Sequence, residues 1–137
     1  MTSAYIWPIL VASVAAFAIG ALWYSPLLFG KQWMALVKMS DADMAAAREN
    51  GVASFYVIQF VITVVTFVVI AFLIELTGAN TPGHGIFIAV LAWIGFPVME
   101  SIGQVMWQKK PVKLVVISLL GTLVCWVVGG AIIGAWR

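Results

Sequence analysis

Residues 53–76 read ASFYVIQFVITVVTFVVIAFLIEL, an apolar stretch in which Glu75 is the only charged side chain. About 20 apolar residues in a helix cover the roughly 30 Å of hydrocarbon in a bilayer. A backbone in lipid must satisfy its own hydrogen bonds, and a segment this long does so as a helix. The stretch therefore predicts a membrane-spanning helix.

Three further apolar stretches of similar length flank this one, at about residues 4–24, 84–107 and 112–136. Of the 137 residues, 64% are hydrophobic and only 9% are charged, whereas soluble domains carry about 25% charged residues. Residues 1–8 contain no Lys or Arg, and the first stretch runs on to residue 23, so we expect a retained helix rather than a secretory signal. The predicted fold class is all-α: a polytopic membrane protein with four transmembrane helices in a single domain, residues 1–137.

Residues 27–51, between the first two spans, have a helical pattern of their own. Phe29, Trp33 and Val37 recur at helical spacing, which predicts a short amphipathic helix in the headgroup layer over residues 27–39. Ser40 followed three residues later by Asp43 resembles an N-cap box and predicts a second short helix over residues 41–50.

The basic residues predict how the chain is oriented. Two loops hold six of the seven, and Arg137 lies on the other side; the six are Lys31, Lys38, Arg48, Lys109, Lys110 and Lys113. Since cytoplasmic loops retain Lys and Arg, we expect an inner (cytoplasmic) membrane location with both basic loops inside and both termini outside. The net charge of +2 is spread too thinly for a nucleic-acid footprint.

Glu100 is the most informative polar position, because an isolated acid within a span costs several kcal/mol. Gln104 and Gln108 follow at helical spacing, and Pro97 removes a backbone donor one turn earlier. One interpretation is a protonatable or cation-binding group in a polar crevice that opens inward. The other is a buried acid, hydrogen-bonded across helices to groups such as Gln59, Thr63 or Thr66. The candidate intramembrane polar site is therefore Glu100, Gln104, Gln108, Gln59 and Thr63.

Small residues recur every fourth position on two spans. The first row is Ala12, Ala16 and Gly20, and the second is Gly121, Cys125 and Gly129, with Gly130 and Gly134 beside it. Such rows let helices approach closely in lipid, so they are predicted to seal the bundle internally or to join copies of it. Cys125 is the only cysteine and has no disulfide partner in the chain, which favours a packing role.

The run GALWYSPLLFGKQWM at residues 20–34 resembles the signature of a family of small bacterial four-helix membrane proteins catalogued as a domain of unknown function. The resemblance extends to Ser40-Asp41, Gly95-Phe96 and residues 111–114. The chain departs from it at Gln104, where the family pattern has Asn, and at Lys109-Lys110, where it has Gly-Arg. The resemblance implies a fold and a membrane but no activity.

The signature residues are expected to form a corner, where the chain turns at the membrane surface. Trp23 and Tyr24 are expected to anchor the first span at the interface, and Trp33 dips back into the bilayer. Lys31 would then meet headgroup phosphates, so these four residues form an interfacial or lipid-headgroup set.

The sequence contains no pattern that is typical of an enzyme. We find no nucleophile with a base, no paired acids, no metal cluster and no phosphate loop, and we therefore expect no catalytic residues, no cofactor and no metal. We expect a helical assembly module, either a homo-oligomer or an accessory subunit of a larger membrane complex. Its partners would be membrane lipids and further copies or other membrane subunits, but not nucleic acid. The alternative is a small proton- or cation-coupled transporter or channel that uses Glu100.

Overall fold

The structure is a computed structural model that describes residues 3–38, 40–49, 51–78 and 80–136. A 3₁₀ turn at Ser3–Tyr5 leads into α1 (Ile6–Trp23); the further elements are α2 (Gly30–Leu36), α3 (Asp41–Glu49), α4 (Ala53–Leu76), α5 (Pro82–Trp93), a π-helical turn (Ile94–Val98), α6 (Met99–Trp107) and α7 (Val112–Ala135). Within the described ranges there is no strand, and four helical segments are long and apolar enough to cross a membrane. The predicted all-α multi-pass fold is confirmed.

The two short helices lie where the sequence predicted them, with different bounds. α2 begins at Gly30 rather than at residue 27, because the chain turns through residues 24–29 first. α3 begins with the predicted N-cap box: the Asp43 amide donates to Ser40 Oγ at 3.1 Å, and the Ser40 amide donates to Asp43 Oδ2 at 2.9 Å. Hydrogen bonding from the Ser40 amide, and then from its hydroxyl, lowers the pKa of the Asp43 carboxyl below its ordinary value of 3.8. Three positions used in the predictions, residues 39, 50 and 137, lie outside the described residues.

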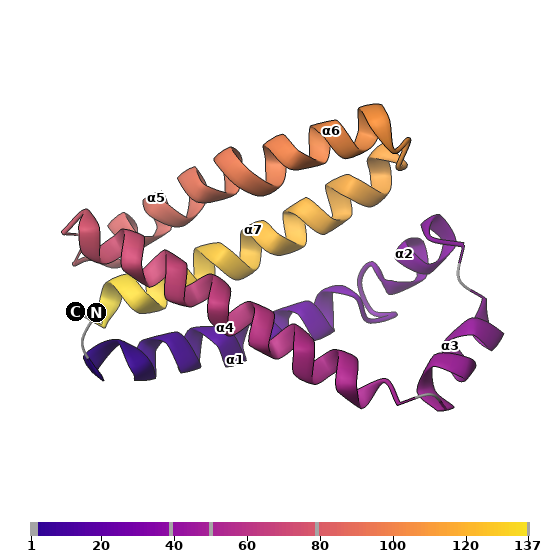
Figure 1. The fold of residues 1–137 in the computed structure, drawn as a ribbon, viewed down its shortest axis with the longest axis horizontal. Coiled ribbons are helices and arrows are strands. Elements are labelled where there is room, and N and C mark those ends of the chain that lie inside the picture. The colour runs from indigo at the N-terminus through magenta and orange to yellow at the C-terminus, as the bar shows by residue number, and fades with distance from the viewer. Residues whose placement is uncertain (1–2, 39, 50, 79, 137) are drawn as a thin grey trace.

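The predicted break at Pro97 takes the form of a π-helical turn. Residues 94–98 adopt the wider helix, and α6 continues directly from it, so α5, the turn and α6 make one continuous span, Pro82–Trp107 (Figure 1). π-helical turns are rare, appear mostly as single turns inside α-helices, and are frequent at functional sites.

α7 is the central helix and packs most extensively against α5 on one side and α1 on the other. Two tryptophans join it to these neighbours. The Trp23 indole Nε1 of α1 donates to the Ile117 carbonyl at 3.0 Å, and Trp93 Nε1 of α5 donates to the Leu119 carbonyl at 2.9 Å. An indole N–H within a membrane needs such a partner, so each ring fixes a helix to the α7 backbone.

Glycines set the closest approach of α5 and α7. A Cβ added at Gly130 would lie 2.6 Å from the Gly85 carbonyl oxygen and 2.9 Å from the Ala89 Cβ. A Cβ at Gly134 would meet the Thr81 carbonyl, and one at Gly85 would meet the Gly130 carbonyl. The two backbones can pack this closely only because side chains are absent there.

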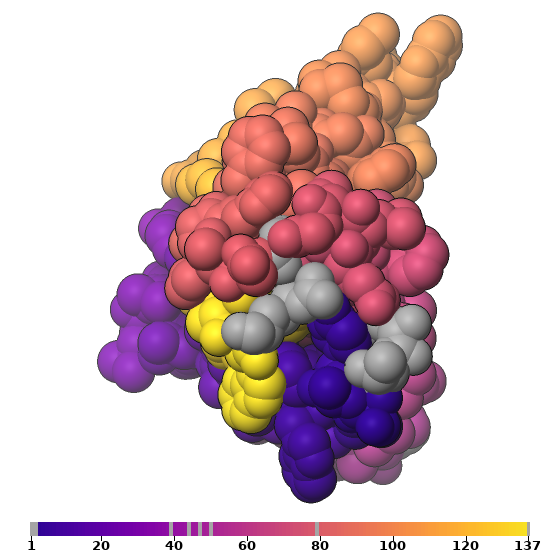
Figure 2. Space-filling model, turned by 90° about the vertical axis from the view of Figure 1, so that its left-hand side faces the viewer, coloured from indigo at the N-terminus to yellow at the C-terminus, as the bar shows by residue number. Residues whose placement is uncertain are grey.

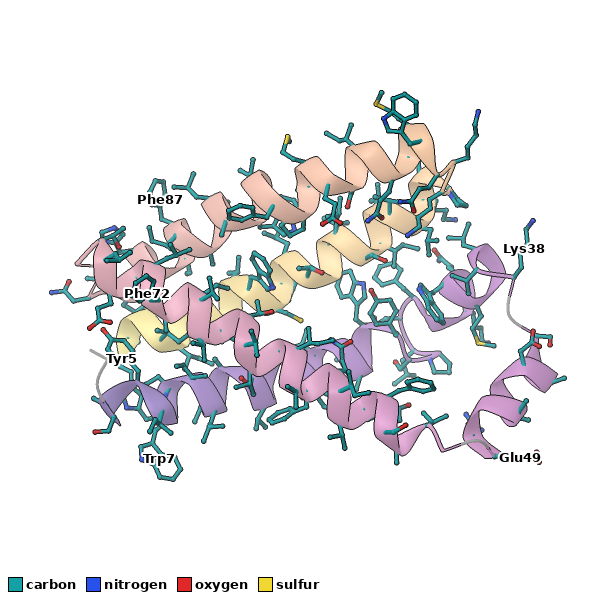
Figure 3. The ribbon with its side chains drawn as sticks, in the orientation of Figure 1. Tyr5, Trp7, Lys38, Glu49, Phe72 and Phe87 are labelled. Atoms are coloured by element: carbon teal, nitrogen blue, oxygen red, sulfur yellow. The ribbon has the colours of Figure 1, made fainter. Side chains whose placement is uncertain are left out.

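The apolar core lies at the end of the bundle where α1 starts and α7 finishes, which we call the terminal end. Its largest fully buried side chains include Phe67, Ile70 and Ile74 of α4 and Ile133 of α7. Figure 2 views this end, where α7 lies between α1 and α5. Tyr5 is buried there, whereas Trp7, 67% exposed, points away from the bundle (Figure 3).

The opposite end, which we call the basic end, is more open. It carries α2, α3 and the turn between α6 and α7, and therefore both predicted basic loops (Figure 1). Figure 1 shows α4 close to α5 at the terminal end and far from the α5–α6 span at the basic end. The four helices therefore form a wedge that is closed by the core and splayed towards the basic residues.

Candidate functional site

Glu100 lies on α6 with its side chain exposed on the surface of the chain. Within the part of the chain that the structure describes, its carboxylate has no hydrogen-bond or ion-pair partner. Seven residues separate it from Trp107 at the end of α6, which is about 10 Å along a helix. The expectation of an acid buried within the chain is wrong, because the face of α6 that carries Glu100 is not covered by the chain's own helices.

Gln104 and Gln108 continue from Glu100 towards the basic end. Gln104 is half-buried, and its Oε1 accepts a hydrogen bond from Lys110 Nζ at 3.3 Å. With Lys110 and Trp33 it lines a shallow cavity of about 250 Å³ between α2, α6 and α7. Gln108 is exposed at the end of α6. The polar stripe predicted on this helix therefore ends beside a lysine.

Gln59 and Thr63 lie elsewhere, in a groove of about 560 Å³ between α1, α4 and α7. We call this the α1–α4–α7 groove. Its described lining residues do not include Glu100, Gln104 or Gln108. The structure therefore separates the five residues of the predicted polar site into two groups, one along α6 and its end and one on the groove face of α4.

The groove combines aromatic walls with neutral polar groups. Phe17 of α1 packs edge-on against Tyr56 and Phe60 of α4, with ring centroids 6.3 and 5.9 Å apart, which joins these two helices beside the groove. Thr63 and Thr66 of α4 line the groove opposite α7, and their hydroxyls donate to the carbonyls four residues earlier at 2.8 and 2.9 Å.

α7 contributes a polar group that sequence reasoning missed. Thr122 lines the groove together with Trp126, and the Thr122 hydroxyl donates to the Ser118 carbonyl at 3.0 Å. The spacing of Ser118 and Thr122 on one helical face was the available signal. Among the residues described, no group of three or more His, Cys, Asp or Glu is placed to hold a metal ion.

The row on α1 and the row on α7 both pack inside the chain. Ala12 and Ala16 are buried in the core region, and the Cys125 thiol of α7 donates to the Ala16 carbonyl at 3.5 Å. A Cβ at Gly129 would meet the Phe67 ring. These contacts close the bundle within one chain. Gly20 differs, since nothing lies within 4 Å of a Cβ added there.

Residues 23–33 form the expected corner. Trp23 packs against Phe29 with the two rings tilted by 40° and their centroids 4.7 Å apart, and Tyr24 meets Trp33 edge-on at 5.8 Å. Gly30 is buried where its amide donates to the Ser25 carbonyl at 2.9 Å, and a Cβ there would meet the Tyr24 carbonyl. Lys31 is exposed beyond the corner.

A sequence profile described as "Protein of unknown function (DUF1761)" matches residues 7–134, which is nearly the whole chain. The chain belongs to the DUF1761 family. The expected membership in a family of unknown function is thus confirmed. No curated protein and no solved structure matches the chain.

For this DUF1761 protein, the match begins in α1 and ends in α7, so it includes all four spans and both short helices. The family assignment therefore concerns the whole bundle, including the groove and the exposed face of α6.

Proposed function

We propose that this chain is a non-enzymatic membrane module that assembles with other membrane helices, and that the Glu100 face of α6 is the contact surface. The partner would be a further copy of the chain or a subunit of a larger membrane complex. The observation that carries the proposal is the exposed Glu100 carboxyl, which has no partner among the described residues and lies about 10 Å from the end of its span.

The physical argument is the cost of leaving this group against lipid. An ionised carboxyl facing the hydrocarbon is unfavourable by several kcal/mol, and acids inside spans normally face other helices or water. A second helix that covers α6 and donates hydrogen bonds to Glu100 would offset this cost. Only 22 to 28% of each candidate span is buried inside the chain, so ample surface remains for such a partner.

The same proposal includes a location. The six basic residues of the two loops gather at the basic end, and cytoplasmic loops retain Lys and Arg. We place the basic end in the cytoplasm and the terminal end outside, in a bacterial inner membrane. A cysteine introduced at Asn80 would then react with an impermeant thiol reagent added outside; labelling only after lysis would invert the orientation.

The assembly proposal is tested by the mass and composition of particles extracted from native membranes into nanodiscs. The expected particle contains more than one copy of the 14.8 kDa chain, or foreign subunits in fixed ratio. Glu100→Leu removes the polar contact but suits lipid, so the variant should fold and lose the partner. Glu49→Gln changes a carboxyl at the basic end (Figure 3) and should keep the assembly. A single-chain wild-type particle would exclude the proposal.

Proton- or cation-coupled transport is the second candidate, and the π-helical turn at Ile94–Val98 directly before Glu100 favours it. Lys110 argues against it, because its ammonium on Gln104 places a positive charge on the path between Glu100 and the basic end. Glu100→Gln should abolish coupled flux in proteoliposomes if this candidate holds, and unchanged flux would remove Glu100 from any transport path.

A further inference from the structure

The α1–α4–α7 groove has the size and position of a binding site within the membrane. Its volume of about 560 Å³ falls in the range of small-molecule pockets, roughly 300 to 1,000 Å³. Along α4 its lining runs from Tyr56 to Phe67, which is about 16 Å of helix. It therefore extends from near the basic end of α4 to the edge of the apolar core.

The groove is lined mainly by apolar surface, with a few polar groups that carry no charge. None of the described residues that line it is Asp, Glu, Lys or Arg. A phosphate or carboxylate headgroup would find no counter-charge there, and desolvating such a group without one is costly. Phe17, Trp23 and Trp126 provide apolar walls, so a suitable ligand is neutral and has an apolar body.

The hydrogen bonds already made inside the groove determine what the ligand must offer. The hydroxyl hydrogens of Thr63, Thr66 and Thr122 are donated to backbone carbonyls of their own helices. Each hydroxyl oxygen therefore has acceptor capacity but no free donor. These oxygens line the groove along α4 and α7, so they can accept hydrogen bonds from a ligand that has a donor.

Gln59 adds to this requirement. Its carboxamide has no hydrogen-bond partner among the residues described, although it lies on a membrane span and lines the groove. An unpaired amide facing hydrocarbon is unfavourable. A ligand O–H could donate to its Oε1 or to a threonine oxygen and accept from its Nε2, which a pure hydrocarbon chain could not do.

We propose that the α1–α4–α7 groove binds a neutral lipid whose polar head is a hydroxyl group. The apolar body would lie against the aromatic walls, and the hydroxyl would hydrogen-bond within the Gln59 and Thr63 surface. Quinols, polyprenols and diacylglycerols share this chemistry. The site is separate from the α6 face proposed for assembly, so either proposal can fail without the other.

The test compares two probes that differ only in the donor. Hexadecanol brominated in mid-chain and its methyl ether are titrated into nanodiscs that hold the whole chain, and quenching of the tryptophan fluorescence is followed. One hydrogen bond corresponds to roughly a fivefold difference in the midpoint, with the alcohol quenching at the lower mole fraction. Trp126→Phe should reduce the difference signal, because Trp126 is one of the two tryptophans that line the groove. Equal quenching by alcohol and ether in the wild type would overturn the proposal.

Variants of the groove residues test whether the preference for the alcohol arises in the groove. Gln59→Leu with Thr63→Val should abolish the preference for the alcohol, whereas Gln108→Leu, a matched change of an exposed glutamine outside the groove, should retain it. If the double variant does not fold, Thr63→Val alone should still reduce the preference, since valine keeps the shape of threonine. A preference that survives in a folded groove variant would overturn the proposal.

The lipids that co-purify with the chain show which native lipid occupies the groove. Mass spectrometry of lipids that co-purify with the chain from native membranes should show a quinol, a polyprenol or a diacylglycerol enriched over the bulk membrane. Each of these would support the proposal and name the ligand. Enrichment of phospholipid alone would overturn it.

Discussion

Gly130→Ala is expected to destabilise the bundle, because the added methyl group has no room between α5 and α7. The new Cβ would lie 2.6 Å from the Gly85 carbonyl oxygen and 2.9 Å from the Ala89 Cβ, and ordinary contact begins at about 3.4 Å. The two backbones would have to separate by about 0.8 Å at this point. Overpacking of this kind costs about 1 to 3 kcal/mol of the free energy of unfolding.

The measurement is equilibrium unfolding in mixed detergent micelles, followed by the loss of helical circular dichroism. Gly20→Ala is the matched control, since nothing lies within 4 Å of a Cβ there and alanine favours a helix over glycine by up to about 1 kcal/mol. The control should therefore be as stable as the wild type or more so. Equal free energies of unfolding for the two variants would refute the close packing of α5 on α7.

Three further predictions concern single interactions. Trp23→Phe should lower the free energy of unfolding by about 1 kcal/mol through the lost hydrogen bond to α7, while Trp7→Phe on the exposed surface should leave it unchanged. Lys109 has a left-handed φ of 56°, which is unfavourable for a residue with a Cβ. Lys109→Gly should therefore raise the free energy of unfolding by about 1 kcal/mol, and a decrease would show that the Lys109 backbone is not strained. The pKa of Asp43 is lower in the folded chain, so the cap stabilises α3 above the ordinary pKa and is lost as the pH falls through the folded pKa. Ser40→Ala should raise that pKa in an NMR titration of the carboxyl carbon, and an unchanged titration would show that the cap has no influence.

The spans could be predicted from sequence because one physical requirement determines them. A helix that crosses hydrocarbon needs a minimum apolar length. The boundaries at residues 53, 76, 107 and 112 agree with the prediction to the residue, and the other four differ by one or two residues. The start of α3 was equally predictable, because Ser40 and Asp43 satisfy each other locally. These features depend on neighbours in the sequence rather than on how the helices pack.

The composition of the polar site could not be predicted in the same way. Spacing along one helix places Glu100 and Gln104 on related faces, but it does not say which other helix lies opposite. Gln59 and Thr63 lie on a face of α4 that looks into the groove beside α1 and α7. That arrangement follows from long-range packing, such as Gly129 against Phe67, which a periodic pattern does not encode.

The groove and the closed core differ in what packs against α7. Towards the terminal end, Gly129, Gly130 and Gly134 let α4 and α5 approach the α7 backbone. Towards the basic end, the Trp23 indole of α1 lies against Gly121 of α7, and Trp126 of α7 lines the groove. Close packing of α4 and α5 on α7 at one end and rings between the helices at the other produce a wedge rather than a parallel bundle. A wedge in a bilayer has to be filled, because exposed polar groups within it would otherwise face hydrocarbon. Replacing the terminal glycines should therefore change the fold and the groove together, whereas changing Glu100 should change only what binds to the outer face of α6.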